Sequence, residues 1–164
     1  MKYGFQQQLK VGKSGEALFK KLYPELEQTD GRVVDFISPE GFRVELKTDT
    51  YDSGNFFIER YSDFEKQTVG GPWQTQSKDG DMYVYMFLAL GKIYWFNVDE
   101  LVSFMDEWID DLSSSQHNRR FKLIKQRGAK YQTGGYTVPI TELEALAFKS
   151  EDIYAVSNKT KQAI

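Results

Sequence analysis

The stretch VVDFISPEGFRVELK, residues 33–47, has the pattern of two short strands joined by a tight turn. Proline favours the second position of a type I turn, and glycine suits the left-handed residue that closes a three-residue hairpin loop. The sequence therefore predicts a β-hairpin of residues 33–37 and 42–47, with residues 39–41 as its loop.

The turn also fixes which residues of the hairpin face each other, and it sorts the side chains by character. Side chains alternate between the two faces of a strand. The apolar face is predicted to carry Val34, Phe36, Phe42, Val44 and Leu46, and the charged face Asp35, Arg43, Glu45 and Lys47. A two-residue loop would mix the faces, so this separation supports the three-residue loop.

On the charged face, Asp35 is expected opposite Glu45, with Cβ atoms about 5 Å apart. Two such carboxylates repel each other unless a cation lies between them, and oxygen ligands suit Mg²⁺ or Mn²⁺. Lys47 lies on the same face, where an amine can position a water molecule and stabilise negative charge. These groups suit phosphodiester hydrolysis. The alternative is a surface hairpin with a Glu–Lys pair, because these residue types are common.

The remainder of the chain predicts further helices and strands within one domain, residues 1–164. Helices are expected at 6–22, 99–112 and 141–147, and strands at 56–60, 82–90, 93–98, 121–125 and 136–140. Gly12 and Gly15 are unfavourable inside a helix, so they indicate either close packing or a break into two helices. The order of elements predicts an α/β fold, with a central mixed β-sheet flanked by helices.

The composition of the chain excludes some kinds of chemistry and argues against some classes of protein. The chain has 164 residues and no cysteine, which excludes disulfides and thiolate chemistry. It has neither the apolar run of a signal peptide nor that of a membrane helix, so we expect a protein of the cytoplasm with no membrane partner. The formal charge of −3 argues mildly against a purely electrostatic DNA coat.

Basic residues are dense between positions 119 and 130, and no acid interrupts them. They are Arg119, Arg120, Lys122, Lys125, Arg127 and Lys130. A mobile basic loop of this kind can grip phosphates. The alternative is a solvated, charged hairpin.

The motifs resemble those of the PD-(D/E)XK nuclease superfamily, and in particular its phage-type members. The likeness rests on Glu16 in the first helix, on Asp35 and on the run ELK at 45–47, and it extends to GNFFIE at 54–59, GPW at 71–73 and DMYVY at 81–85. Val34 stands where the proline of the family motif would be. The resemblance covers roughly residues 12 to 146 and implies a restriction-endonuclease-like core.

The resemblance also implies roles for individual residues. Asp35, Glu45 and the Leu46 carbonyl would bind Mg²⁺ or Mn²⁺, Lys47 would orient the attacking water, and Glu16 would be a further acid. Lys78 would lie near the DNA. The implied activity is a metal-dependent DNA endonuclease that leaves 5′-phosphate and 3′-hydroxyl ends, acting on branched, nicked, phage or host DNA, in the host cytoplasm if the protein is viral.

Two side chains have two interpretations each, and the single histidine has one. Trp73 can stack on a base or anchor its loop in the core. Glu59 can support the acid site or be a surface acid on an edge strand. His117 is the only histidine, which disfavours a zinc site, and we expect no special role for it.

The main alternative function is a non-catalytic DNA-binding or assembly module that retains the nuclease fold, because fold alone does not determine activity. A homodimer is plausible, since cutting both strands of a duplex often requires two sites.

Overall fold

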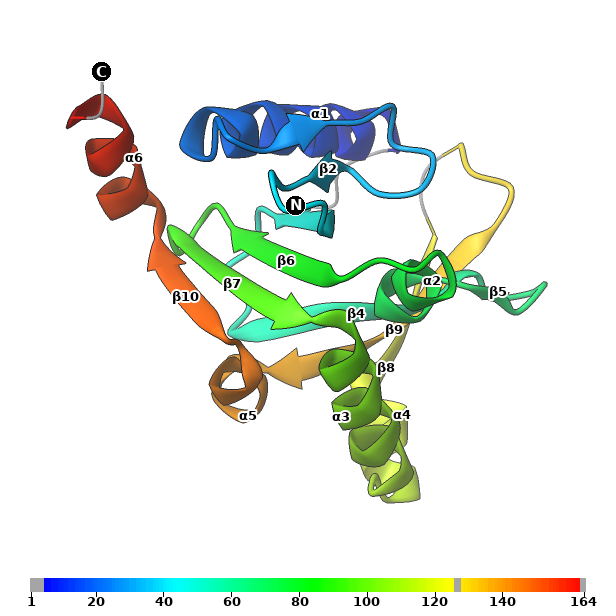
Figure 1. Cartoon of the computed structure of the whole chain (residues 1–164). Helices are drawn as coiled ribbons and strands as arrows, with labels where there is room; N and C mark the ends of the chain where they lie inside the picture. Colours follow the sequence, from blue (N-terminus) through cyan, green and yellow to red (C-terminus); the bar gives the residue numbers. More distant parts are fainter. Residues whose placement is uncertain (1–4, 126–127, 163–164) are drawn as a thin grey trace.

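The computed structural model describes residues 5–125 and 128–162, and they form an α/β fold with a mixed central sheet flanked by helices (Figure 1). The helices are α1 (Phe5–Leu22), α2 (Gly71–Ser77), α3 (Val98–Asp110), α4 (Ser114–Arg120), α5 (Ile140–Leu143) and α6 (Ile153–Gln162), with a 3₁₀ turn at Glu144–Leu146. The strands are β1 (Glu27–Gln28), β2 (Phe36–Ile37), β3 (Arg43–Asp49), β4 (Asn55–Asp63), β5 (Thr68–Val69), β6 (Met82–Phe87), β7 (Lys92–Asn97), β8 (Phe121–Lys125), β9 (Gln132–Pro139) and β10 (Lys149–Asp152).

The central sheet, sheet A, has the strand order β1-β2-β3-β6-β7-β10. The pair β3 and β6 is parallel, and the other neighbouring pairs are antiparallel. This sheet confirms the mixed sheet expected from the sequence.

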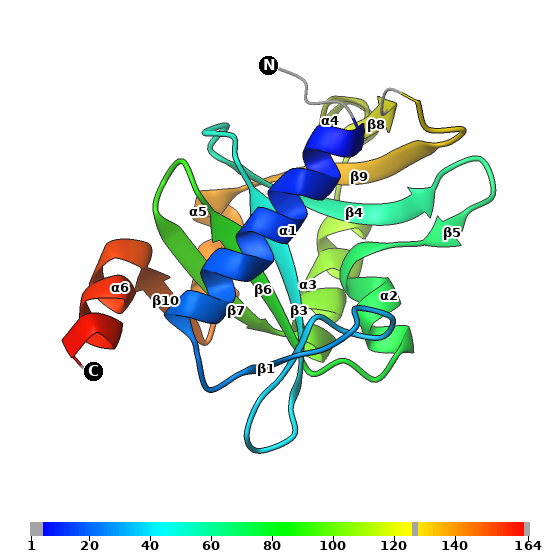
Figure 2. The ribbon, with the colours of Figure 1, turned by 90° about the horizontal axis from the view of Figure 1, so that it is seen from above.

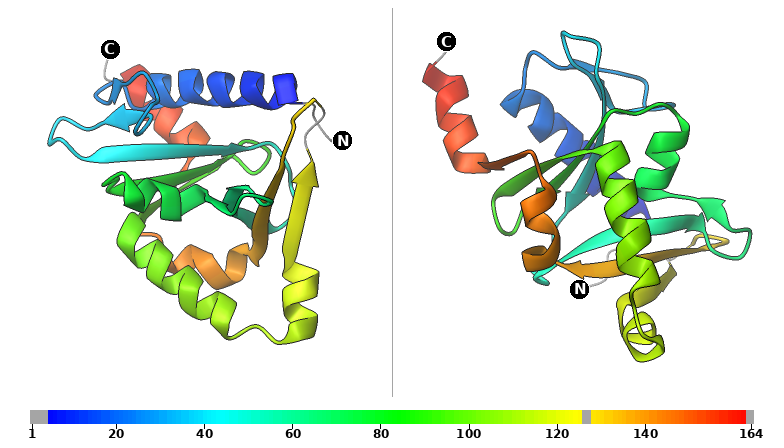
Figure 3. Two further views of the ribbon diagram at one scale, coloured as in Figure 1. Left: turned by 90° about the vertical axis from the view of Figure 1, so that its right-hand side faces the viewer. Right: turned by 60° about the horizontal axis from the view of Figure 1, so that its bottom comes forward.

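The chain also forms a second sheet, sheet B, with the order β5-β4-β9-β8, which the sequence did not indicate. The strand predicted at 56–60 lies here as part of β4. It cannot join sheet A beside β3, because β2 and β6 already occupy both edges of that strand. Viewed from the side, β8 and β9 run steeply across the direction of β3 (Figure 3).

Two hydrophobic clusters hold these layers together. One cluster lies between sheet A and the helices α1 and α6, and includes Phe19, Phe36, Val44 and Trp95. The other lies on the opposite face of sheet A and joins it to sheet B and α3, largely through the aromatic rings of β4, β6 and β7. Seen from above, α1 lies diagonally across β3 and β6 (Figure 2).

The predicted hairpin forms, with the three-residue loop. Phe36 pairs with Val44, the Ser38 N–H donates to the Phe42 carbonyl at 2.9 Å, and Gly41 has the left-handed φ of +89°. The first strand of the hairpin, β2, is shorter than predicted, because its pairing with β3 begins at Phe36. Phe42 was expected in the core but is 45% exposed at the tip of the hairpin.

The helix α1 is continuous, so of the two alternatives for the glycines in this helix, a break into two helices is excluded and close packing is found. Gly15 is where the close packing occurs: a Cβ placed on it would lie 2.1 Å from the Thr48 hydroxyl oxygen on β3. The helix expected at 99–112 is α3, and its N-terminal cap is the Asn97 side chain, which accepts a hydrogen bond from the Glu100 N–H. No helix among residues 5–125 and 128–162 is long and apolar enough to cross a membrane.

Candidate acid site between the two sheets

The predicted acids and the predicted lysine lie on or beside β3, the strand that pairs with β6. Val44 and Leu46 contact the cluster under α1. By strand alternation, Glu45 and Lys47 point the other way, toward sheet B. Their partners in the parallel register, Tyr83 and Tyr85, are buried on that same side.

Asp35 approaches the site from the irregular segment before β2. Its N–H donates to the Val44 carbonyl at 3.1 Å, and its carboxylate Oδ2 accepts from the Leu46 N–H at 2.9 Å. Asp35 therefore leaves the predicted cross-strand pairing with Glu45 and binds the edge of β3. The Leu46 carbonyl lies on the same edge as its N–H, because both groups of a strand residue point to one side.

Asp35 and Glu45 are half-buried, and the negative charge of a neighbouring acid acts on each of them. Burial raises the pKa of Glu45 to about 8, and the charge of Asp35 adds to the rise, while Lys78 opposes it. Burial likewise raises the pKa of Asp35 to about 6, against the hydrogen bond from Leu46, and Glu16 raises it further. A site of this kind favours the arrival of positive charge.

Glu16 reaches the site from α1. Its Oε2 accepts a hydrogen bond from the Gln28 side-chain amide at 3.1 Å. Its charge contributes to the raised pKa of both Asp35 and Glu45. Gly15, the residue before Glu16, is where α1 packs closely against Thr48 of β3.

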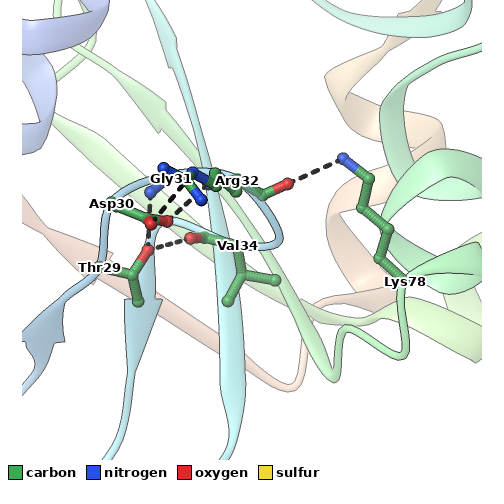
Figure 4. Close-up of polar contacts among 6 residues, drawn as sticks. All are labelled: Thr29, Asp30, Gly31, Arg32, Val34 and Lys78. Atoms are coloured by element: carbon green, nitrogen blue, oxygen red, sulfur yellow. Dashed lines mark hydrogen bonds and ion pairs between the residues drawn. The ribbon is translucent and has the colours of Figure 1, made fainter.

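Two lysines lie near the acids, each beside a different one. The charge of Lys47 acts chiefly on Glu59 of β4, where it lowers the pKa that burial raises. Lys78, at the end of α2, is the cation that lowers the pKa of Glu45. Its Nζ donates to the Arg32 carbonyl at 3.2 Å, so it spans from α2 to the loop before Asp35 (Figure 4).

Of the two interpretations of the basic run at 119–130, the structure agrees with the charged hairpin, since most of the run lies in α4 and in β8, which pairs with β9. Arg119 and Arg120 end α4, Lys122 and Lys125 lie on β8, and Lys130 lies between β8 and β9; Arg127 falls outside the described residues. The helix α4 begins with a capping box of Ser113 and Gln116, a signal that was present in the sequence. In sheet B, β9 lies between β8 and β4, and the Arg120 guanidinium donates to the Asn55 side chain of β4 at 3.5 Å.

The contacts of Trp73 and His117 show that both side chains have packing roles. Trp73 is 8% exposed and its Nε1 donates to Asp106 at 2.9 Å, so it anchors α2 in the core and cannot offer its face to a base. His117 lies 2.9 Å from the Tyr136 hydroxyl and stacks on Phe121, which gives it a packing role.

The oxygen atoms of Asp35, Glu45 and the Leu46 carbonyl are of the kind that hard divalent cations prefer. Within the described part of the chain, no group of three or more His, Cys, Asp or Glu residues is arranged to hold a metal ion. Magnesium is commonly bound by one or two protein carboxylates together with water and substrate phosphates, so a pair of acids meets its requirement. Asp35, Glu45 and the Leu46 carbonyl supply oxygen alone.

Comparisons with known proteins do not assign this chain to a family: no family model matches its sequence, and neither does any curated protein.

Proposed function

We propose that the chain is a Mg²⁺- or Mn²⁺-dependent DNA endonuclease with a restriction-endonuclease-like core. The observation that carries the proposal is the pairing of two poorly solvated carboxylates, Asp35 and Glu45, at a strand that also presents Lys47. The raised pKa of each acid marks a place where a cation stabilises the ionised pair.

In this proposal Asp35, Glu45 and the Leu46 carbonyl hold the ion. A bound divalent ion supplies charge neutralisation at the phosphoryl oxygens and a water of lowered pKa. Lys47 directs its ammonium at the attacking oxygen and at the charge that develops on the phosphate. Glu16 adds a further acid on the α1 side of the site.

The DNA contacts are proposed on two sets of cations. The charge of Lys78 acts on Glu45, which supports a contact of this lysine with a phosphate next to the cleaved bond. The exposed lysines of β8, together with Arg119 and Lys130, are proposed to hold the duplex at a distance from that bond. A homodimer would bring two such sites to one duplex.

Cleavage of defined DNA tests the function. Supercoiled plasmid, a four-way junction and single strands should be incubated with Mg²⁺, with Mn²⁺ or with chelator. We expect cutting only with metal, and a loss of roughly 10²–10³-fold in Lys47→Ala, as for removal of one transition-state donor. Asp35→Ala should be at least as impaired, whereas Lys66→Ala, an exposed lysine outside the site, should cut normally.

Two outcomes would count against this mechanism. Undiminished cutting by Lys47→Ala would remove the lysine from the chemistry. DNA binding without cutting of any substrate, in either metal, would favour the alternative of a binding or assembly module.

A further inference from the structure

The strand β4 contains an irregularity at the point where it passes the acid site. Glu59 pairs with Gly135 of β9 and Tyr61 pairs with Gly134, so Arg60 is an extra residue in a β-bulge. Bulges redirect the side chains beside them and are frequent near active sites. The guanidinium of Arg60 lies over the Trp73 ring, 4.7 Å from its centroid, which fixes the bulge against α2.

Glycines surround Glu59 on two sides. A Cβ on Gly70 would lie 2.4 Å from Oε1 of Glu59, and one on Gly71 would lie 2.1 Å from the Glu59 carbonyl oxygen. From β9, a Cβ on Gly135 would lie 3.0 Å from the Glu59 Cα. Any side chain at Gly70 or Gly71 would displace Glu59, so the local sequence is fitted to this one acid.

The carboxylate of Glu59 has a fixed partner and a charged neighbour. Burial raises the pKa of this carboxylate, while the charge of Lys47 and the backbone of Gly71 lower it. The strand β4 also passes close to the part of sheet A that contains Lys47. The Phe57 N–H of β4 donates to the hydroxyl of Tyr85 at 3.1 Å, and Tyr85 is the register partner of Lys47. Glu59 and Lys47 therefore lie on two strands, one from each sheet, that meet at Tyr85.

We propose that Glu59 is a positioning residue of the acid site, a carboxylate contributed by sheet B that holds the Lys47 ammonium in its working orientation. This inference rests on the proposed function. A lysine carries its charge on a flexible four-carbon stem, so an anchored anion near its tip restricts the orientations that the ammonium adopts. Groups that orient reactive side chains in this way commonly matter for activity about 10–100-fold.

Single-turnover cleavage of a bound duplex tests the effect on chemistry. Glu59→Gln keeps the size of the side chain and removes the charge, and we expect it to slow cleavage roughly 10–100-fold while DNA affinity stays unchanged. Gly70→Ala should slow cleavage in the same way, although the carboxylate is retained. The matched control is Glu65→Gln, an exposed acid beyond the end of the same strand. Cleavage by Glu59→Gln at the wild-type rate would overturn the inference.

A second readout does not depend on cleavage. Unfolding free energies of Lys47→Gln, Glu59→Gln and the double variant, measured in urea without metal, form a double-mutant cycle. We expect the double variant to lose less than the sum of the single losses, because either change alone breaks the pair. Additive losses would overturn the inference even if the protein cuts DNA. If wild type cuts no DNA and the losses are still non-additive, the pairing stands and the nuclease function fails.

Discussion

Asp35 and Glu45 keep their protons to a higher pH in the folded chain than in the unfolded one. Burial raises the pKa of Asp35 from 3.8 to about 6 and that of Glu45 from 4.5 to about 8. At a pH between the unfolded and folded pKa of each acid, the folded state binds more protons than the unfolded state. Stability therefore falls as the pH rises.

This behaviour gives a prediction for the metal-free protein. Between about pH 4 and pH 8, the free energy of unfolding should decrease, and Glu45→Gln should remove at least about 1 kcal/mol of that decrease, since one pKa unit corresponds to about 1.4 kcal/mol. Urea unfolding at pH 5 and pH 8 with chelator measures it. Glu40→Gln, in the exposed hairpin loop, is the control. An equal pH dependence in wild type and Glu45→Gln would contradict the burial of this acid.

The same residues show how far a local pattern predicts a site. The turn at 39–41 and the alternation of β3 depend on neighbouring residues only, and the predicted loop and the Phe36–Val44 pairing are both confirmed. The proximity of Lys78 and Glu59 to the acids depends on contacts between distant segments. Gly70, Gly71 and Gly135 approach Glu59 closely, a packing that depends on contacts between distant segments and could not be predicted from the sequence.

Among the elements, α1 is fixed to β3 through a contact that only glycine permits. A Cβ at Gly15 would lie 2.1 Å from the Thr48 hydroxyl oxygen and 2.8 Å from its Cβ. Gly15→Ala should destabilise the protein by about 1–3 kcal/mol, as overpacking commonly does. The substitution raises helix propensity by up to about 1 kcal/mol, so a net loss identifies the contact as the dominant effect.

Thermal or urea unfolding of Gly15→Ala tests this, and Ser14→Ala, one residue earlier and exposed, should be near neutral. A more stable Gly15→Ala protein would mean that α1 does not press on β3. Glu16 adjoins Gly15, so the variant should also cut DNA more slowly if the proposed function holds.

Several of the strands that the sequence did not predict are short. The strands β1 and β10 have two and four residues, and each forms by pairing with an edge that another strand provides. Such strands have no periodicity of their own to detect. The longer α3 and β6 carry strong apolar patterns, and both were predicted to within a few residues.

At the scale of the whole molecule, a buried tyrosine links the two sheets. The Tyr85 hydroxyl of β6 donates to Asp49 at 2.6 Å and accepts from the Phe57 N–H of β4 at 3.1 Å. Tyr85→Phe leaves both partners unsatisfied at a buried position, so we expect a loss of about 1–3 kcal/mol in unfolding free energy.

The matched control is Tyr94→Phe, because that hydroxyl makes one long contact of 3.5 Å with Glu144. Urea denaturation of both variants compares them, and the Tyr94→Phe loss should be clearly smaller. Equal losses would show that the Tyr85 hydroxyl does not secure the junction of the sheets.

The division of the strands into two sheets has a consequence for how the protein would fail under stress. Asp35, Glu45 and Lys47 belong to one layer, while Glu59 belongs to the other. If the layers drift apart on warming, the reactive groups lose their alignment while each layer keeps its own backbone pairing. If the proposed cleavage activity holds, its loss on heating would then precede the melting of secondary structure, and the temperature gap between the two transitions would widen when the bridging tyrosine is replaced.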